Sequence, residues 1–222
     1  MTHLLPTLVR TLVAAATLFA AATTAHAQGV TGDVQAGQKK AEMCIGCHGI
    51  VGYQNSFPEI HKVPMISGQT EQYIAASLNA YKKGDRRHPS MRGIAGSLSE
   101  QDMADLAAYY ASHAVKTAPE TPRTASVAVA ALIEKGACAS CHGANFSKPI
   151  DPSYPKIAGQ HADYLFVALK AYTVEGNNMV GRSNGIMAGI AKQYTPAEMR
   201  AMAKYLASVE GELAIKPQSR FR

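Results

Sequence analysis

Two cysteine pairs of identical spacing constrain this chain more than any other feature of its sequence. The segments Cys44-Ile45-Gly46-Cys47-His48 and Cys138-Ala139-Ser140-Cys141-His142 both read Cys-x-x-Cys-His, and a glycine follows each of them. Together they contain all 4 cysteines of the chain. One helical turn brings the two sulfurs of a pair to the same side and places the next imidazole beside them. Any fold of this chain must accommodate two such groups of two sulfurs and one imidazole.

This spacing is the attachment signature of c-type haem, in which each cysteine forms a thioether and the adjacent histidine binds the iron. Paired zinc sites place their cysteine pairs about 15–20 residues apart, whereas 94 positions separate Cys44 from Cys138. A thioredoxin-like redox pair needs a βαβ pattern that is missing here, and two disulfides would not explain the histidines. We therefore predict two covalently attached haems c. The covalent attachment residues are Cys44, Cys47, Cys138 and Cys141, and the proximal iron ligands are His48 and His142.

The landmarks around the two motifs also occur twice. A Pro-x-Ile-x-Gly-Gln segment begins at Pro64 and again at Pro155, and a Met-x-x-Ile-Ala segment begins at Met91 and again at Met187. Between the repeats, a segment with two prolines disfavours helix and is typical of a linker. The sequence therefore predicts an all-α protein of two tandem cytochrome c-like helical domains, each around one covalent haem. The predicted boundaries are 28–117 for the first domain, 118–125 for the linker and 126–222 for the second domain.

The last helix of each half is the most clearly marked. Ser99 with Asp102 resembles a capping box, and Thr195 with Glu198 is a better one, with Pro196 at the first helical position. Apolar residues follow at helical spacing in both cases. Each half is then expected to run as helix, haem motif, loop, helix, methionine-bearing loop and helix.

The second axial ligand decides whether a haem iron carries electrons or binds a substrate. Met91 and Met187 correspond in the repeat and follow their proximal histidines by 43 and 45 residues. The helical methionines Met103, Met199 and Met202 fit core packing better. We predict Met91 and Met187 as axial ligands, with a neighbouring methionine or simple packing as the alternative.

Two other residue types near the motifs have weaker claims to a role. Pro64 and Pro155 could each offer a carbonyl to the free ring N–H of a proximal histidine, or they could only shape the loop. His88 precedes Met91 by three residues, but a lone histidine is more often a hydrogen-bonded or surface residue than a ligand.

The first residues are expected to be removed from the mature protein. A polar stretch ending at Arg10, an apolar run from Leu12 to Ala22 and the segment Ala25-His26-Ala27 are typical of a signal peptide, which predicts cleavage after Ala27. The apolar run is shorter than the roughly 20 residues that span a bilayer, which argues against an anchor. Residues 1–27 are therefore predicted to direct export to a bacterial periplasm.

The charge of the chain bears on its partners. The formal net charge is +6, and the cluster Lys82-Lys83 with Arg86-Arg87 could steer docking onto an acidic partner or form a solvated face. Nucleic-acid binding is not expected, because the basic residues lack an interleaved aromatic platform.

In combination, these residues resemble the diheme cytochrome c4 family, in which two class I cytochrome c domains are joined in tandem. The match covers nearly all of the mature chain and is carried by the two haem motifs, by Met91 and Met187 and by the twice-used Pro-x-Ile-x-Gly-Gln loop. The resemblance implies an electron carrier rather than an enzyme, soluble or loosely associated with the membrane. It would take electrons from a quinol-oxidising respiratory complex and pass them to a terminal oxidase or reductase.

Two alternatives stay open at this point. The chain could be the haem-bearing electron-acceptor subunit of a dehydrogenase complex, as in flavocytochrome c sulfide dehydrogenase, whose haem subunit resembles this family. It could also be a diheme enzyme with one open haem, such as a peroxidase or a thiosulfate dehydrogenase.

Overall fold

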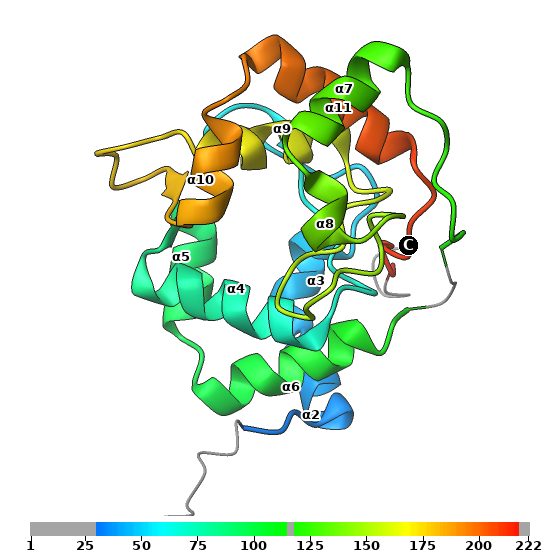
Figure 1. The fold of residues 1–222 in the computed structure, drawn as a ribbon. Helices are drawn as coiled ribbons and strands as arrows, with labels where there is room; N and C mark the ends of the chain where they lie inside the picture. The colour runs from blue at the N-terminus through cyan, green and yellow to red at the C-terminus, as the bar shows by residue number, and fades with distance from the viewer. Residues whose placement is uncertain (1–29, 115–117, 218–222) are drawn as a thin grey trace, which may run out of the picture. The chain divides into compact units, whose positions relative to one another are not determined.

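The helices of the described residues form two series of five that follow the sequence repeat (Figure 1). The computed structural model describes residues 30–114 and 118–217, so the predicted signal peptide and its cleavage site lie outside the described residues. The first series is α2 (Val34–Lys40), α3 (Glu42–His48), α4 (Glu71–Lys83), α5 (Pro89–Gly96) and α6 (Glu100–Ala111). The second series is α7 (Val127–Lys135), α8 (Cys138–His142), α9 (Ala162–Ala171), α10 (Gly185–Ala191) and α11 (Pro196–Ser208).

The predicted capping boxes at the last helix of each half are confirmed. At the start of α6, the Ser99 side chain accepts from the Asp102 N–H, and the Asp102 carboxylate accepts from the Ser99 N–H. Thr195 and Glu198 form the same reciprocal pair at the start of α11, with Pro at the first helical position. Each pair satisfies two backbone donors that the first turn would otherwise leave unpaired.

The methionine-bearing segments are short helices, so the expectation of loops there was wrong. Met91 lies on α5, which begins at Pro89, a residue whose fixed φ suits the first helical position. Met187 lies on α10, where the Asn184 side chain caps the helix by accepting from the Met187 N–H at 3.0 Å. The glycines of both segments obscure the helical pattern, whereas the residues that start each helix are the ones that reveal it.

Two short antiparallel ribbons complete the secondary structure of the described residues. β1 (Gln54–Asn55) pairs with β2 (His61–Lys62) inside the first half. β3 (Arg86–Arg87) pairs with β4 (Gly181–Arg182) and joins the two halves, with Arg86 opposite Arg182. Strands of two residues are too short to give an alternating sequence pattern. The predicted all-α class is confirmed apart from these ribbons.

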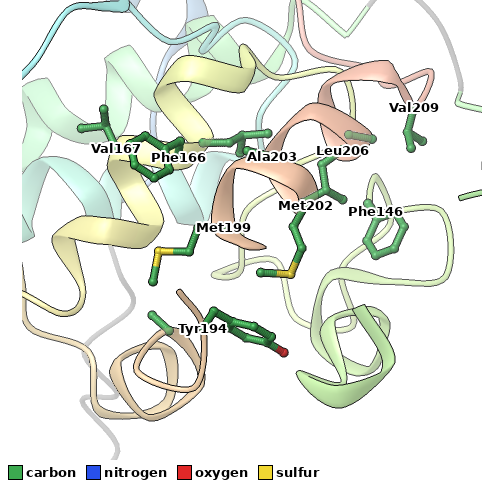
Figure 2. Close-up of a cluster of buried hydrophobic side chains, with 12 residues drawn as sticks. Phe146, Phe166, Val167, Tyr194, Met199, Met202, Ala203, Leu206 and Val209 are labelled. Atoms are coloured by element: carbon green, nitrogen blue, oxygen red, sulfur yellow. The ribbon is translucent and has the colours of Figure 1, made fainter. Parts of the chain in front are cut away.

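Each half has its own apolar core, and the last helix supplies much of it. Met103 and Leu106 of α6 are almost fully buried in the first half. Figure 2 shows the second core, where Met199 and Met202 of α11 lie on the side of the helix toward Tyr194. These methionines pack in the cores, as their helical spacing predicted.

The segment that follows α11 joins the two halves. Glu212 forms an ion pair with Lys156 at 2.6 Å and accepts from the Ala118 N–H at 3.2 Å. Two residues later, the Ala214 N–H donates to the Ser67 carbonyl at 3.0 Å, which places the second half's last segment against the first half's loop. The described residues from Thr31 onward accordingly form one compact unit. The described part of the predicted linker, 118–125, carries no helix or strand.

A buried carboxylate fastens α2 to α6 in the first half. Asp105, which is 2% exposed, accepts from Lys40 Nζ at 2.5 Å and from the Asp33 N–H and Gln101 Nε2 at 2.8 Å each. The hydrogen bond from Lys40 is the main cause that lowers the pKa of Asp105 below its usual value. Asp105 therefore stabilises this helix contact in its ionised form.

Replacing Asp105 by asparagine is expected to lower the free energy of unfolding at pH 7 by about 2 kcal/mol, since bonds to charged groups contribute about 1.5–3 kcal/mol. A carboxylate with a lowered folded-state pKa stabilises the protein above its unfolded pKa of about 3.9 and loses this effect as the pH falls through the folded value. The difference between wild type and variant should therefore shrink below about pH 4. Urea unfolding of both proteins, followed by circular dichroism at pH 7 and pH 3, measures this difference in the free energy of unfolding.

The matched control is Glu175→Gln, because Glu175 pairs with Lys192 on the surface with 76% of its side chain exposed. Exposed ion pairs contribute little, so no measurable change is expected from this variant. Equal losses in the two variants at pH 7 would contradict the role assigned to Asp105.

Candidate haem-binding sites

A single cavity of about 780 Å³ brings together the residues that the sequence singled out. Its lining contains both cysteine pairs, both proximal histidines, both repeat methionines and both loop prolines. These residues are Cys44, Cys47, His48, Pro64 and Met91 from the first half and Cys138, Cys141, His142, Pro155 and Met187 from the second. A space of this size, lined largely by apolar and aromatic side chains, suits a bulky apolar ring system.

Two of the four cysteines have an environment unlike that of a redox thiol. None of the four is in a disulfide. Burial raises the pKa of the Cys44 thiol to about 11 and also raises the pKa of Cys138, whereas a thiol-disulfide redox centre needs a lowered pKa. Within the described ranges, no group of three or more His, Cys, Asp and Glu side chains could hold a bare metal ion. The zinc and thioredoxin-like alternatives therefore have no support in this geometry.

The two proximal histidines have equivalent environments. Nδ1 of His48 lies 2.9 Å from the Pro64 carbonyl oxygen, and Nδ1 of His142 lies 2.9 Å from the Pro155 carbonyl oxygen. Burial lowers the pKa of both imidazoles and outweighs the opposite effect of the proline carbonyls. The rings are therefore neutral, with Nδ1 as the donor and Nε2 left as the nitrogen that can bind a metal.

The Pro-x-Ile-x-Gly-Gln loops are held in the same way in both halves. The backbone N–H of Gly68 donates to the Tyr110 carbonyl of α6, and that of Gly159 donates to the Leu206 carbonyl of α11, each at 2.9 Å. Both glycines have positive φ, +84° and +73°, which other residues adopt only with strain. A Cβ on Gly68 would also collide with the Glu212 carbonyl. The motif thus places each proline carbonyl beside its histidine.

Four methionines line the cavity, which leaves the choice of axial thioether a prediction. Met91 on α5 and Met187 on α10 are equivalent in the repeat, whereas Met65 and Met202 have no methionine counterpart. His88 is the N-cap residue of α5, and its Nε2 lies 3.2 Å from the Phe57 carbonyl oxygen.

Sequence reasoning missed a pair of arginines in the same cavity. Nη2 of Arg86 and Nη2 of Arg182 donate to the hydroxyl of Tyr164 at 3.3 and 2.9 Å. The guanidinium carbon of Arg86 also lies 4.6 Å from the ring centroid of Tyr81, and that of Arg182 lies 5.4 Å from the centroid of Tyr172. Arg86 therefore lines the cavity, so the interpretation of the Arg86-Arg87 segment as a docking cluster was wrong for this residue.

The two guanidiniums give the cavity an uncompensated positive charge. In the part of the chain that the structure describes, no carboxylate lies within ion-pair distance of Arg86 or Arg182, and the Nε atom of Arg86 is buried without a hydrogen-bond partner. Burial would raise the pKa of Tyr164, but Arg182 and Arg86 outweigh it and lower this pKa to about 8. The cavity is thus matched to an apolar ligand with carboxylate substituents, which is the chemistry of haem.

A signal for these arginines was present in the sequence. Arg86 and Arg182 recur with the same offset as Met91 and Met187, and each precedes its methionine by five residues. The repeat therefore marks them as equivalent, although it does not say what they contact.

Comparison with known proteins agrees with this geometry. The family model for cytochrome c matches residues 34–114 and 126–210. Cytochrome c4 of Pseudomonas aeruginosa is 32% identical over 188 residues, which are 82% of this chain and 90% of that protein. The thiosulfate dehydrogenase electron acceptor of Thiomonas intermedia is 32% identical over 178 residues, 76% of this chain and 79% of that protein. The crystal structure of reduced recombinant cytochrome c4 from Pseudomonas stutzeri matches with a TM-score of 0.60 and 28% identity, over 81% of this chain and 100% of that chain.

The matches have the same twofold organisation as the site. Each segment matched by the family model contains one Cys-x-x-Cys-His motif, one Pro-x-Ile-x-Gly-Gln loop and one repeat methionine. The chain belongs to the cytochrome c4 family and is a diheme electron-transfer cytochrome, with two covalently attached haems c in two tandem cytochrome c domains.

Proposed function

We propose that the chain is a periplasmic electron carrier that moves single electrons between redox proteins and catalyses no reaction of its own. The observation that carries this proposal is the cavity whose lining contains two equivalent sets of predicted iron ligands, one from each half. Residues 28–117 and 126–222 are the proposed haem domains, with 118–125 as the linker between them.

Each half supplies the same set of residues to its haem. When bound, each haem supplies one iron that takes up and releases a single electron. The proposed covalent attachment is through Cys44 and Cys47 in the first half and through Cys138 and Cys141 in the second. His48 and His142 present Nε2 to the iron, and the carbonyls of Pro64 and Pro155 hold each ring in its orientation.

The proposed axial methionines decide the type of chemistry. Thioethers from Met91 and Met187 would complete the coordination of both irons and leave no position for a substrate. They would also raise both reduction potentials relative to sites with harder ligands. Arg86 and Arg182 are the proposed partners of the haem carboxylates, because both guanidiniums line the cavity, both donate to the Tyr164 hydroxyl, and they lie opposite each other on the ribbon between the halves.

The proposed partners are a quinol-oxidising respiratory complex as donor and a terminal oxidase or reductase as acceptor. The formal net charge of +6 favours acidic docking surfaces on these partners. Export by the predicted signal peptide, residues 1–27, would place the chain in the periplasm. None of the helices in the described ranges is long and apolar enough to cross a membrane.

The visible spectrum of the dithionite-reduced protein, before and after carbon monoxide, tests this function. We expect the bands of haem c in a ratio of two haems per chain and no change with carbon monoxide, because both irons are six-coordinate. A shift in a substantial fraction of the absorbance of the wild-type protein would mean an open iron and would favour a diheme enzyme instead.

A second function is favoured by one comparison. The Thiomonas relative is a thiosulfate dehydrogenase electron acceptor and shares 32% identity with this chain, so the chain could receive electrons from such an enzyme. Thiosulfate alone should then leave the oxidised protein unchanged, whereas thiosulfate with a purified thiosulfate dehydrogenase should reduce both haems. Reduction by thiosulfate alone would indicate that the chain has the enzymatic activity itself, and copurification of a flavoprotein would favour a flavocytochrome subunit.

A further inference from the structure

The glutamine of each Pro-x-Ile-x-Gly-Gln loop forms hydrogen bonds with the backbone of the other half. Gln160 of the second half donates from Nε2 to the Met65 carbonyl at 2.8 Å and accepts from the Met65 N–H at 3.0 Å. Gln69 of the first half donates to the Lys156 carbonyl at 3.0 Å and accepts from the Lys156 N–H at 2.9 Å. Both glutamines are buried, 4% and 5% exposed. Each amide thus pairs with both backbone groups of one residue in the other half.

Each glutamine side chain accepts a hydrogen bond from a backbone N–H. The carbonyl oxygen of that same peptide group lies at hydrogen-bond distance from Nδ1 of a proximal histidine. The peptide between Pro64 and Met65 accepts from His48 Nδ1 with its oxygen and donates to Gln160 with its nitrogen. The peptide between Pro155 and Lys156 accepts from His142 Nδ1 with its oxygen and donates to the Gln69 side chain with its nitrogen. Each proximal histidine is therefore two hydrogen bonds away from a glutamine of the opposite half.

This arrangement has an electronic consequence for the histidine. Hydrogen bonds in series polarise one another, so a peptide whose N–H is bound accepts more strongly at its oxygen. A stronger bond at Nδ1–H makes Nε2 a better electron donor to a metal. More donation stabilises the oxidised iron over the reduced iron and lowers the reduction potential.

We infer that the two glutamines are crossed positioning residues: Gln160 tunes the reduction potential of the haem held by His48, and Gln69 tunes that of the haem held by His142. This inference rests on the proposed function, because it requires both histidines to bind haem iron. An amide suits the position because it donates and accepts at the same time, which neither a carboxylate nor an apolar side chain of similar length can do.

The test uses the holoprotein with Gln69→Leu and Gln160→Leu, two variants that are matched controls for each other. The two haems are titrated separately through their haem methyl proton signals, assigned by contacts to residues of their own domain. In Gln69→Leu, the ratio of reduced to oxidised haem at fixed applied potential should rise roughly twofold at the haem held by His142. It should stay unchanged at the haem held by His48, and Gln160→Leu should give the opposite pattern.

The crossing distinguishes this role from a merely structural one. A loosened interface would shift the reduction potentials of both haems together, and a local packing defect would shift the potential of the haem in the mutated half. Either of these results, or no shift at all, would overturn the inference. If a leucine variant does not load haem, Gln69→Asn and Gln160→Asn keep the amide on a shorter side chain and should give a smaller crossed shift. Failure of the proposed function would be seen separately, as missing haem or carbon monoxide binding in the wild-type protein.

Discussion

In the Met187→Ala variant, carbon monoxide is expected to bind the haem held by His142, so that about half of the reduced haem absorbance shifts. Alanine removes the thioether from α10 and leaves one coordination position of that iron free. The potential of this haem should also fall by on the order of 0.1 V, within the range of about 0.8 V that axial ligands span. Visible spectra with carbon monoxide and a spectroelectrochemical titration measure both effects.

The chain offers two comparisons for this variant. Met91→Ala should open the other haem in the same way, because Met91 is its equivalent on α5. Met179→Ala should change neither spectrum nor potential, since Met179 is 54% exposed and does not line the haem cavity. If Met187→Ala still excludes carbon monoxide, another thioether that lines the cavity, Met65 or Met202, must be the ligand.

The second large effect is expected from the arginines of the cavity. Arg182→Gln should lower the potentials of both haems, because a positive charge between the halves favours the state that carries one more electron. Two unit charges roughly 10 Å apart, here the guanidinium and the electron on the haem, interact with an energy on the order of 1–2 kcal/mol at an effective dielectric constant of about 20. This corresponds to a shift on the order of 60 mV, or a tenfold change in the ratio of reduced to oxidised haem. The equivalent Arg86→Gln should give a shift of the same sign.

Arg200→Gln is the matched control for the charge. Arg200 lies over the Phe166 ring on the exposed side of α11, outside the haem cavity. Solvent and salt screen such a charge, so its removal should hardly change the potentials, and the little effect it has should vanish at high salt. A shift in Arg182→Gln that disappears at high salt would mean that this guanidinium acts from the surface rather than from the cavity.

The parts of the site that depend only on residues close together in the sequence could be predicted. The Cys-x-x-Cys-His motifs encode their own geometry, because the cysteines and the histidine are held by the same helical turn. The capping boxes at Ser99 and Thr195 are equally local, and both helices begin where these residues place them. The cofactor and the all-α class follow from signals of this kind.

The segments around the methionines show where local signals fail. Gly185 and Gly189 disfavour helix around Met187, yet α10 forms there, because Asn184 caps its first turn. A side-chain cap stabilises a helix by about as much free energy as one glycine destabilises it. Composition alone therefore does not tell whether the helix forms.

The contacts between the halves could not be predicted, although the repeat identified the residues that make them. Gln69 and Gln160 were visible as equivalent positions, as were Arg86 and Arg182. That each glutamine binds the opposite half, and that the arginines lie on one ribbon, depends on how the two halves pack together. One sequence contains no direct record of that packing.

The contact of Ala214 with Ser67 also determines the order in which the molecule can be completed. Ser67 belongs to the loop that orients the first haem's histidine, and its partner is near the end of the chain. A ribosome releases residue 67 long before residue 214. The loop of the first half therefore gains this contact only when nearly the whole chain has been made, so the first half cannot complete its structure before the second.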